Sequence, residues 1–551
     1  MKVYLLYPQK EWLNPEPYFD EKAIVQDLGL KTLFLAAAKE VVKEDGKVKR
    51  IREADLYLEE TMKKVVMVPV EAEEILYRQE ILRDCLQEEN FIRSLYELAC
   101  DILDQWDRLG RRAGRKAGEG SPRVLVTKIH VLQLFVTGLS RLKRLLEEYG
   151  GKHYSRGFLA LQGRLQEEFS DGMERTLKKI LQDVAFYANE KEHTESVNAP
   201  MENRPRILAG CSVGDGLKLC HFRLQDVATD SRKYQSSGGN FLERAQEYLG
   251  IRGKNVVYVN RDASLGGQTD LLEYTGVEYI VSCCEPFFKA FEKFFDQLRF
   301  QAAFYRGAVN LRAYLERFQL PYCYPAAGSG DCLKFRELKE FVMSIEQKMT
   351  PVGNTCDIEG KSLLVVTGAN QGGKSTFLRS VGIAQVMFQC GLMVAAEHFE
   401  SGVFPFFFTH FTRREDSAMN SGRLDEELGR MSQIIDHLGQ NSMILLNESF
   451  ASTTEKEGSV IVYDIVRALT EAGVKVLTVT HLLSFARKVY QEALQDPDFG
   501  AVFLSAQRME GGRRTYKMIA HAPELTSFGL DLYDEVIGGG GADGNRVGQS
   551  S

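Results

Sequence analysis

The chain has 551 residues, of which 44% are hydrophobic and 26% are charged, and its net charge is −7. This length implies several domains rather than one core. The acidic balance excludes a surface that attracts nucleic acid everywhere, so any DNA-binding surface must be local.

The cysteines and the N-terminus indicate the compartment. Ten cysteines show neither C-x-x-C pairing nor metal-ligand spacing, which predicts reduced thiols in a reducing compartment. Residues 1–13 lack the layout of a signal peptide. The sequence contains no run of about 18 apolar residues, so no membrane span is predicted. We therefore predict a cytoplasmic protein that makes no membrane contact.

The N-terminal part of the chain is predicted to be helical. Apolar residues recur at helical spacing over 27–42, 71–109, 128–148 and 158–187. Between the second and third of these, a Gly/Ala-rich segment ending near Pro122 carries the basic residues Arg108, Arg111, Arg112, Arg115 and Lys116. A phosphate-contacting loop is one interpretation, but we favour a solvated linker.

A small β-containing insert is predicted next. Residues 206–213 and 217–224 alternate polar and apolar side chains around a Gly-Asp-Gly turn, which predicts a hairpin. Residues 255–259 and 277–282 are also rich in β-forming residues and are predicted to be strands.

A second long helix is predicted to begin at Pro286, a residue that suits a first helical turn. If it runs to Phe318 it is about 50 Å long, at about 1.5 Å per residue. We interpret its aromatic stripe as core rather than as a platform for stacking bases.

From residue 333 the chain is predicted to be α/β, and it contains a phosphate-binding pattern. Gly368, Gly373, Lys374 and Ser375 fit G-x-x-x-x-G-K-[ST] between an apolar strand and a helix. The glycines let backbone N–H groups face phosphate oxygens, and the helix N-terminus adds positive potential. Lys374 can reach the β- and γ-phosphates, and the Ser375 hydroxyl can bind Mg²⁺. The predicted nucleotide-binding residues here are Gly368, Ala369, Asn370, Gln371, Gly372, Gly373, Lys374, Ser375 and Thr376.

Two further apolar strands end in residues that suit nucleotide chemistry. Residues 442–446 run into Asn447 and Glu448, where an acidic pair usually holds Mg²⁺ and polarises the attacking water. Asn447 can accept hydrogen bonds from Mg²⁺-bound water but supplies no charge, and Glu448 is the candidate general base. The strand 474–480 leads into His481, which can sense the γ-phosphate, although such a histidine is often structural.

Ser421 precedes a charged helix, so it is a candidate helix cap and phosphate contact. Residues 501–509 and 514–519 predict a final hairpin. The Gly-rich tail from Gly538 onward is expected to be disordered.

Together these motifs resemble the MutS family of DNA mismatch-repair ATPases, within the ABC ATPase superfamily. Thr367–Arg379 is similar to that family's T-G-P-N-M-G-G-K-S-T segment, and Gly391–Glu397 to its next block. Asn447–Gly458 resembles its D-E-x-G-R-G-T-S-T-x-[DE]-G block, and Thr480–His481 matches its switch histidine. The resemblance is strong over 350–535 and weaker over 20–330.

The resemblance implies a homodimer with two composite Mg²⁺–ATP sites that closes around DNA. Ser421 falls where the family places the serine that contacts the partner's nucleotide. The sequence departs from the family in three ways. The N-terminal mismatch-reading domain is expected to be absent, the insert 206–281 has equal numbers of basic and acidic residues, and Ala369 and Asn447 replace Pro and Asp.

The expected architecture is a multidomain α and α/β protein, with a long-helix core/lever region and a small β-containing insert before a P-loop ABC-type ATPase domain. The predicted domains are 1–205 (helical core/lever), 206–281 (insert in the clamp position), 282–332 (returning lever helix), 333–537 (ATPase) and 538–551 (tail).

The predicted function is ATP-dependent binding of double-stranded or branched DNA in mismatch repair or related repair and recombination. A nucleotide-gated dimeric scaffold with little hydrolysis is an alternative, favoured by Asn447. An ATPase that acts on a protein partner is another, favoured by the acidic net charge. A transporter ATPase is disfavoured by the long helical region.

Overall fold

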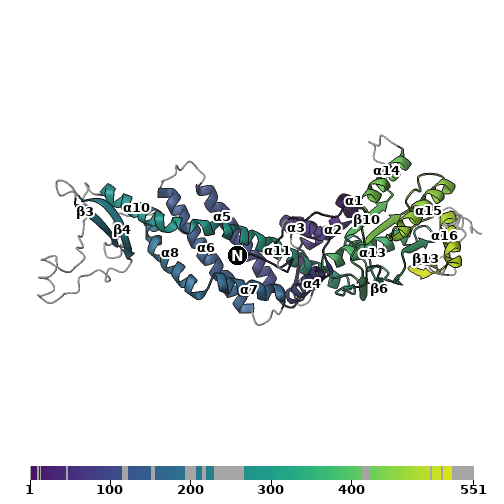
Figure 1. Cartoon of the computed structure of the whole chain (residues 1–551). Helices are drawn as coiled ribbons and strands as arrows, with labels where there is room; N and C mark the ends of the chain where they lie inside the picture. The colour runs from purple at the N-terminus through teal and green to yellow at the C-terminus, as the bar shows by residue number, and fades with distance from the viewer. Residues whose placement is uncertain are drawn as a thin grey trace, which may run out of the picture. The chain divides into compact units, whose positions relative to one another are not determined.

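The computed structural model of the chain describes residues 2–8, 11–12, 14–44, 47–51, 53–113, 122–149, 155–192, 206–213, 219–228, 266–412, 422–496, 499–509 and 513–523. The protein is a mixture of helical and α/β structure, as predicted (Figure 1). It divides into two compact units. Unit 1 comprises residues 1–3, 93–154 and 158–299, and unit 2 comprises residues 4–92, 155–157 and 300–551.

Unit 1 is built from long helices around an apolar core. Helix α6 (Pro122–Tyr149) packs against α8 (Asp171–Glu192) and α10 (Gly266–Ser282). Most of α5 (Glu89–Ala113) and α7 (Arg156–Glu168) also belongs to this unit. The buried core of these helices includes residues spaced three or four apart on α6 and their partners: Leu125, Ile129, Leu132, Val136, Val184, Val277 and Val281.

The first half of α11 (Glu285–Arg317) supplies an aromatic cluster to the same unit. The Phe291 ring lies 4.7 Å from Phe295 and 5.2 Å from Phe135, measured between centroids. Phe291 is 2% exposed, so the aromatic stripe is core, as predicted.

Residues Val124–Tyr149 of α6 are long and apolar enough, by length and composition alone, to cross a membrane. The sequence had predicted no membrane span. This is weak evidence for a span, because 44% of the apolar window is buried inside the protein and a core helix meets the same criterion.

The insert region confirms one prediction and corrects another. Strand β3 (Arg206–Val213) pairs antiparallel with β4 (Leu219–Ala228), which is the predicted hairpin. The strand predicted over 277–282 is wrong, since these residues end helix α10. Val277 and Val281 are β-branched, but four-residue spacing places both on one helical face, where they are buried. The strand predicted over 255–259 lies outside the described residues.

The basic segment is also partly corrected. Arg108, Arg111 and Arg112 lie on α5, which continues to Ala113. Arg115 and Lys116, as well as the Gly-rich tail, lie outside the described residues.

The first helices of unit 2 are shorter than predicted. The helix expected over 27–42 is divided into α1 (Glu21–Asp27) and α2 (Leu30–Ala37), because Gly29 has a left-handed φ of +68°. A strand, β1 (Val41–Glu44), follows and pairs with β2 (Lys47–Ile51). Helices α3 (Leu56–Val66) and α4 (Ala72–Gln87) complete this part.

A six-stranded sheet forms the centre of unit 2, in the order β10-β11-β12-β8-β13-β14. All neighbouring strands are parallel except β14, which is antiparallel to β13. The strands are β8 (Leu363–Thr367), β10 (Phe406–Phe411), β11 (Ser442–Asn447), β12 (Lys475–Val479), β13 (Ala501–Arg508) and β14 (Arg514–Ala520).

Helices cover both faces of this sheet, because successive side chains of a buried strand point to opposite sides. Ile444 and Leu446 belong to a core cluster shared with α14 (Arg423–Asp436), α15 (Glu455–Glu471) and α16 (Leu483–Gln495). Leu445 points the other way, against Gly382 of α13 (Lys374–Gln389).

A second, four-stranded sheet has the order β5-β9-β6-β7. Its strands are β5 (Ala326–Ala327), β6 (Leu333–Leu338), β7 (Asn354–Asp357) and β9 (His398–Ser401), and α12 (Phe341–Gln347) follows β6.

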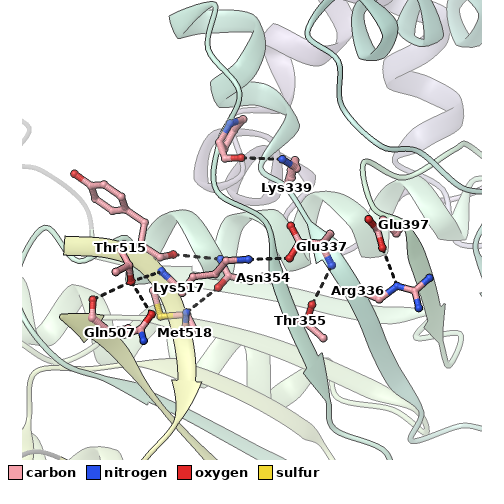
Figure 2. A network of polar contacts seen from close by, with 12 residues as sticks. Arg336, Glu337, Lys339, Asn354, Thr355, Glu397, Gln507, Thr515, Lys517 and Met518 are labelled. Carbon is pink, nitrogen blue, oxygen red and sulfur yellow. Dashed lines mark hydrogen bonds and ion pairs between the residues drawn. The ribbon is translucent and has the colours of Figure 1, made fainter. Parts of the chain in front are cut away.

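A polar network joins the β6–β7 pair to strand β14, as Figure 2 shows. The Met518 N–H donates to Asn354 Oδ1 at 2.7 Å, and Lys517 Nζ donates to Glu337 Oε1 at 2.8 Å. Thr355 Oγ1 accepts from the Glu337 N–H at 3.1 Å. The network therefore holds the hairpin β13–β14 in place beside strand β8.

Candidate functional site

Three strand ends meet at one edge of the central sheet. Strand β12 lies between β11 and β8, and Val479 is in register with both Asn447 and Val366. Because the three strands are parallel, the residues that follow them lie close together, at the edge where open α/β sheets bind ligands. A cavity of about 610 Å³ opens here, lined by Asn370, Gln371, Glu448, Glu455, His481 and Leu483. The sequence motifs of three separate segments thus face one space.

The loop between β8 and α13 has a backbone that requires glycine. Gly368 has a φ of +109° and Gly373 a φ of +89°, in the left-handed region that other residues rarely adopt. A Cβ on Gly368 would lie 2.9 Å from the backbone nitrogen of Ala506. Gln371 also has a left-handed φ, of 58°, and its Oε1 accepts from Arg514 Nη1 at 3.0 Å. The hairpin β13–β14 therefore supports this loop, a contact that the sequence did not reveal.

Lys374 begins helix α13 and is 4% exposed. Its Nζ donates to the carbonyl oxygens of Gly368 at 2.9 Å and Ala369 at 3.0 Å. Burial lowers the pKa of this lysine, and the nearby Glu448 carboxylate opposes that shift. The ammonium group thus closes the loop on itself. Ser375 and Thr376 follow in the first turn of the helix.

Asn447 ends strand β11, and its Oδ1 is buried. None of the residues that the structure describes donates a hydrogen bond to this oxygen. A buried acceptor without a partner is costly, and Mg²⁺ usually retains several bound waters that donate hydrogen bonds. The residues present therefore fit a hydrated Mg²⁺ ion, with Asn447 as a hydrogen-bond acceptor.

Glu448 follows Asn447 and lines the cavity. Its φ of 53° is left-handed, which is strained for a residue with a side chain. The Glu448 N–H donates to the Val479 carbonyl at 2.8 Å, and Thr412 Oγ1 donates to the Glu448 carbonyl at 2.7 Å. Two neighbouring strands therefore hold the peptide that carries the candidate general base.

His481 and Glu455 line the same cavity. Glu455 accepts from the Ser484 N–H and from the Ser484 hydroxyl, both at 3.0 Å. The Ser484 N–H, more than any other group, lowers the pKa of the Glu455 carboxyl. Glu455 was not among the predicted site residues. The sequence indicates Glu455 only weakly as a site residue, because it is one of three consecutive charged residues directly after Thr454, the N-cap of α15.

Ser421 lies outside the described residues, so its predicted nucleotide contact stays a prediction. The structure has Gly422, rather than Ser421, at the N-cap position of α14. Glycine is a favourable N-cap residue because it leaves the first backbone N–H groups of the helix accessible to solvent or to a ligand.

A parallel strand, a loop with left-handed glycines and a helix that begins at a buried lysine together have the geometry that the P-loop pattern of the sequence predicts. Comparison with known proteins agrees. A family model described as MutS domain V matches residues 364–534, and one described as MutS2 N-terminal domain matches residues 70–318. The two matches together cover more than half of the chain. The chain belongs to the MutS family, and the resemblance found in the sequence is confirmed.

Curated relatives match part of the chain at low identity. The DNA mismatch repair protein MutS of Thermus aquaticus is 26% identical over 232 residues, which are 42% of this chain and 28% of that protein. The human MutS protein homolog 4 is 28% identical over 184 residues, 32% of this chain and 19% of that protein. The chain thus spans less than a third of the length of these relatives.

Proposed function

We propose that this protein binds and hydrolyses Mg²⁺–ATP and couples the nucleotide cycle to DNA engagement, as part of mismatch repair or related DNA repair and recombination. The observation that carries the proposal is the cavity at which the P-loop, Glu448 and His481 converge. The proposed link to DNA rests on relatives such as the DNA mismatch repair protein MutS of Thermus aquaticus.

Each residue of the site has a proposed role. The loop amides from Gly368 to Gly373 and the Lys374 ammonium bind the phosphates, with Ser375 and Thr376 at the start of the helix. Ser375 and, through water, Asn447 would hold a Mg²⁺ ion, which would supply positive charge to the phosphate oxygens. Glu448 orients and deprotonates the attacking water, and His481 senses the γ-phosphate.

The active unit is proposed to be a homodimer with composite sites, in which Ser421 contacts the nucleotide bound by the partner subunit. The domain division 1–205, 206–281, 282–332, 333–537 and 538–551 stays a proposal, as does a cytoplasmic location. The cysteines that the structure describes include buried free thiols, such as Cys85 and Cys390, which suits a reducing compartment.

A second candidate is a nucleotide-gated dimeric scaffold that hydrolyses ATP very slowly. Asn447 favours it, because an amide adds no negative charge at the metal position. Steady-state ATP hydrolysis, measured with saturating Mg²⁺, separates the two candidates, since the scaffold binds ATP without turnover. A third candidate, an ATPase acting on a protein partner, is favoured by the net charge of −7.

DNA binding is the decisive experiment. The full chain is titrated into plain duplex, mismatched duplex and four-way junction DNA, with and without Mg²⁺–ATP, at two salt concentrations. We expect binding that depends on nucleotide and weakens steeply with salt, because phosphate contacts release counterions. Absence of binding to all three DNA structures in every nucleotide state would leave the protein-partner candidate.

A further inference from the structure

The loop that follows strand β11 has an unusual backbone at two positions. Glu448 has a φ of 53° and Phe450 a φ of 60°, and neither residue is a glycine. Left-handed conformations of such residues persist only where surrounding contacts enforce them. Val479 and Thr412 hold the Glu448 peptide, as described above, but none of their hydrogen bonds among the described residues involves the peptide of Phe450.

Glu427 of helix α14 supplies the second restraint. Its Oε2 accepts from the Phe450 N–H at 2.6 Å, and the residue is 6% exposed. Burial raises the pKa of this carboxyl, while the hydrogen bond from Phe450 lowers it. Without this acceptor, the Phe450 N–H would lose the bond that stabilises its strained backbone.

His410, near the end of strand β10, connects Glu427 to Ser449, which lies between Glu448 and Phe450 in the chain. Its Nε2 lies 3.1 Å from the Glu427 carbonyl oxygen, which only accepts, so Nε2 carries the proton in that bond. Its Nδ1 lies 2.8 Å from Ser449 Oγ, and its ring stacks on Phe450 with a centroid separation of 5.3 Å. His410 is 0% exposed, so no solvent competes for these bonds.

We propose that Glu427, supported by His410 and Ser449, is a positioning residue that fixes the conformation in which Glu448 faces the nucleotide. This rests on the proposed ATP hydrolysis and adds to it a residue that no motif singled out. Glu427 is not among the residues that line the cavity, so it acts through Glu448 rather than on the phosphate. A sequence signal exists in retrospect, because Glu427 shares a helix face with buried Met431 and Ile434.

The test compares Glu427→Ala with Glu427→Gln in the full chain. The alanine variant removes the acceptor for the Phe450 N–H, whereas the glutamine variant keeps an amide oxygen in its place. We expect Glu427→Ala to lower kcat for ATP at least tenfold with KM within twofold of the wild type. Glu427→Gln should retain at least a third of the wild-type kcat. Asp436→Ala, an exposed acid on the same helix, is the matched control and should leave both constants unchanged.

The possible failures are distinguishable. If the wild type binds ATP but shows no turnover, the proposed hydrolysis fails, and the inference fails with it. If the wild type turns over and Glu427→Ala retains its kcat, only the inference is overturned. A parallel rise in KM, or equal losses in the alanine and glutamine variants, would also overturn it.

Ser449→Ala provides the measurement if Glu427→Ala does not fold, because it removes a single hydroxyl from the same network. We expect kcat to fall threefold to tenfold with unchanged KM, and an unchanged kcat would overturn the inference. Combining either variant with Glu448→Gln should cause no further loss, because the restraint acts only through Glu448.

Discussion

The two units bury polar groups very differently. Among the described residues, the only buried polar or charged side chain of unit 1 is Lys143, whereas unit 2 buries more than twenty, including Arg78, Gln301 and His410. Every left-handed residue other than glycine in the described chain also lies in unit 2.

The two units are therefore stabilised by different kinds of interaction. Unit 1 relies on apolar stripes. These tolerate change at exposed positions, because hydrophobic stabilisation is proportional to the buried apolar area and does not depend on direction. Unit 2 holds the loops of the candidate site with directional hydrogen bonds to buried groups, and such networks lose their effect when one member is removed. Mutations in the two units should therefore have different signatures, and the following predictions test that difference.

Glu448→Ala should produce the largest effect. A positioned general base contributes roughly 10²- to 10⁴-fold, so we expect turnover of ATP to fall at least about 100-fold. ATP affinity should change little, because Lys374 and the loop amides remain. Steady-state hydrolysis and calorimetric titration measure the two quantities, with Glu471→Ala as an exposed control on α15. Unchanged turnover would remove Glu448 from the mechanism.

Phe291→Ala should destabilise unit 1 by about 3 to 5 kcal/mol, because it leaves a cavity within an aromatic cluster. Phe287, one helical turn earlier, is 56% exposed, so Phe287→Ala should cost less than about 0.5 kcal/mol. Hydrogen exchange in α6 and α11 reports the stability of unit 1 directly. Similar costs for both variants would show that burial does not govern stability there.

Glu340 tests a buried acid of unit 2. Burial raises the pKa of its carboxyl to about 7, while the hydrogen bond from the Met343 N–H opposes the shift. The folded state thus binds this proton more tightly than the unfolded state, whose pKa is the ordinary 4.5. The stabilising contribution is complete below pH 4.5 and is lost as pH rises through about 7.

Glu340→Gln should therefore remove that dependence. Between pH 5 and pH 8, the wild type should lose roughly 2 to 3 kcal/mol more stability than the variant, at about 1.4 kcal/mol per pKa unit. Urea unfolding at several pH values, monitored by hydrogen exchange in α12 and α13, measures the difference. Parallel pH profiles would show that Glu340 titrates normally.

Asn447→Asp should have a smaller effect. A carboxylate adds a negative charge where the amide has none, so half-maximal ATP binding should need roughly threefold to tenfold less Mg²⁺. Titration of Mg²⁺ at fixed ATP measures this shift. An unaltered Mg²⁺ dependence would place Asn447 away from the metal.

Arg141→Ala should have the smallest effect. Arg141 Nη1 lies 2.5 Å from Asp101 Oδ2 in unit 1, but both side chains are more than 40% exposed. Exposed ion pairs contribute less than about 1 kcal/mol, so hydrogen exchange in α5 and α6 should change little. A large loss would mean that unit 1 also depends on directional polar contacts.

The amino-acid sequence alone predicted the features whose pattern lies within one short segment. The P-loop pattern, the apolar strands before Asn447 and His481, and the long aromatic helix all follow from spacing along a single segment. Their roles in the chemistry stay predictions, but the structure brings the segments to one cavity, as parallel strands require.

Features that depend on distant partners were inaccessible from the sequence. Val277 to Ser282 have the composition of a strand, but in the structure they end helix α10, which packs against α6. The sequence places Glu427 on the same helix face as Met431 and Ile434, but it does not show that Phe450, from another strand end, donates to it. The pattern within one segment indicates which of its side chains can be buried. A hydrogen bond between two segments forms only once the fold has brought its donor and acceptor together.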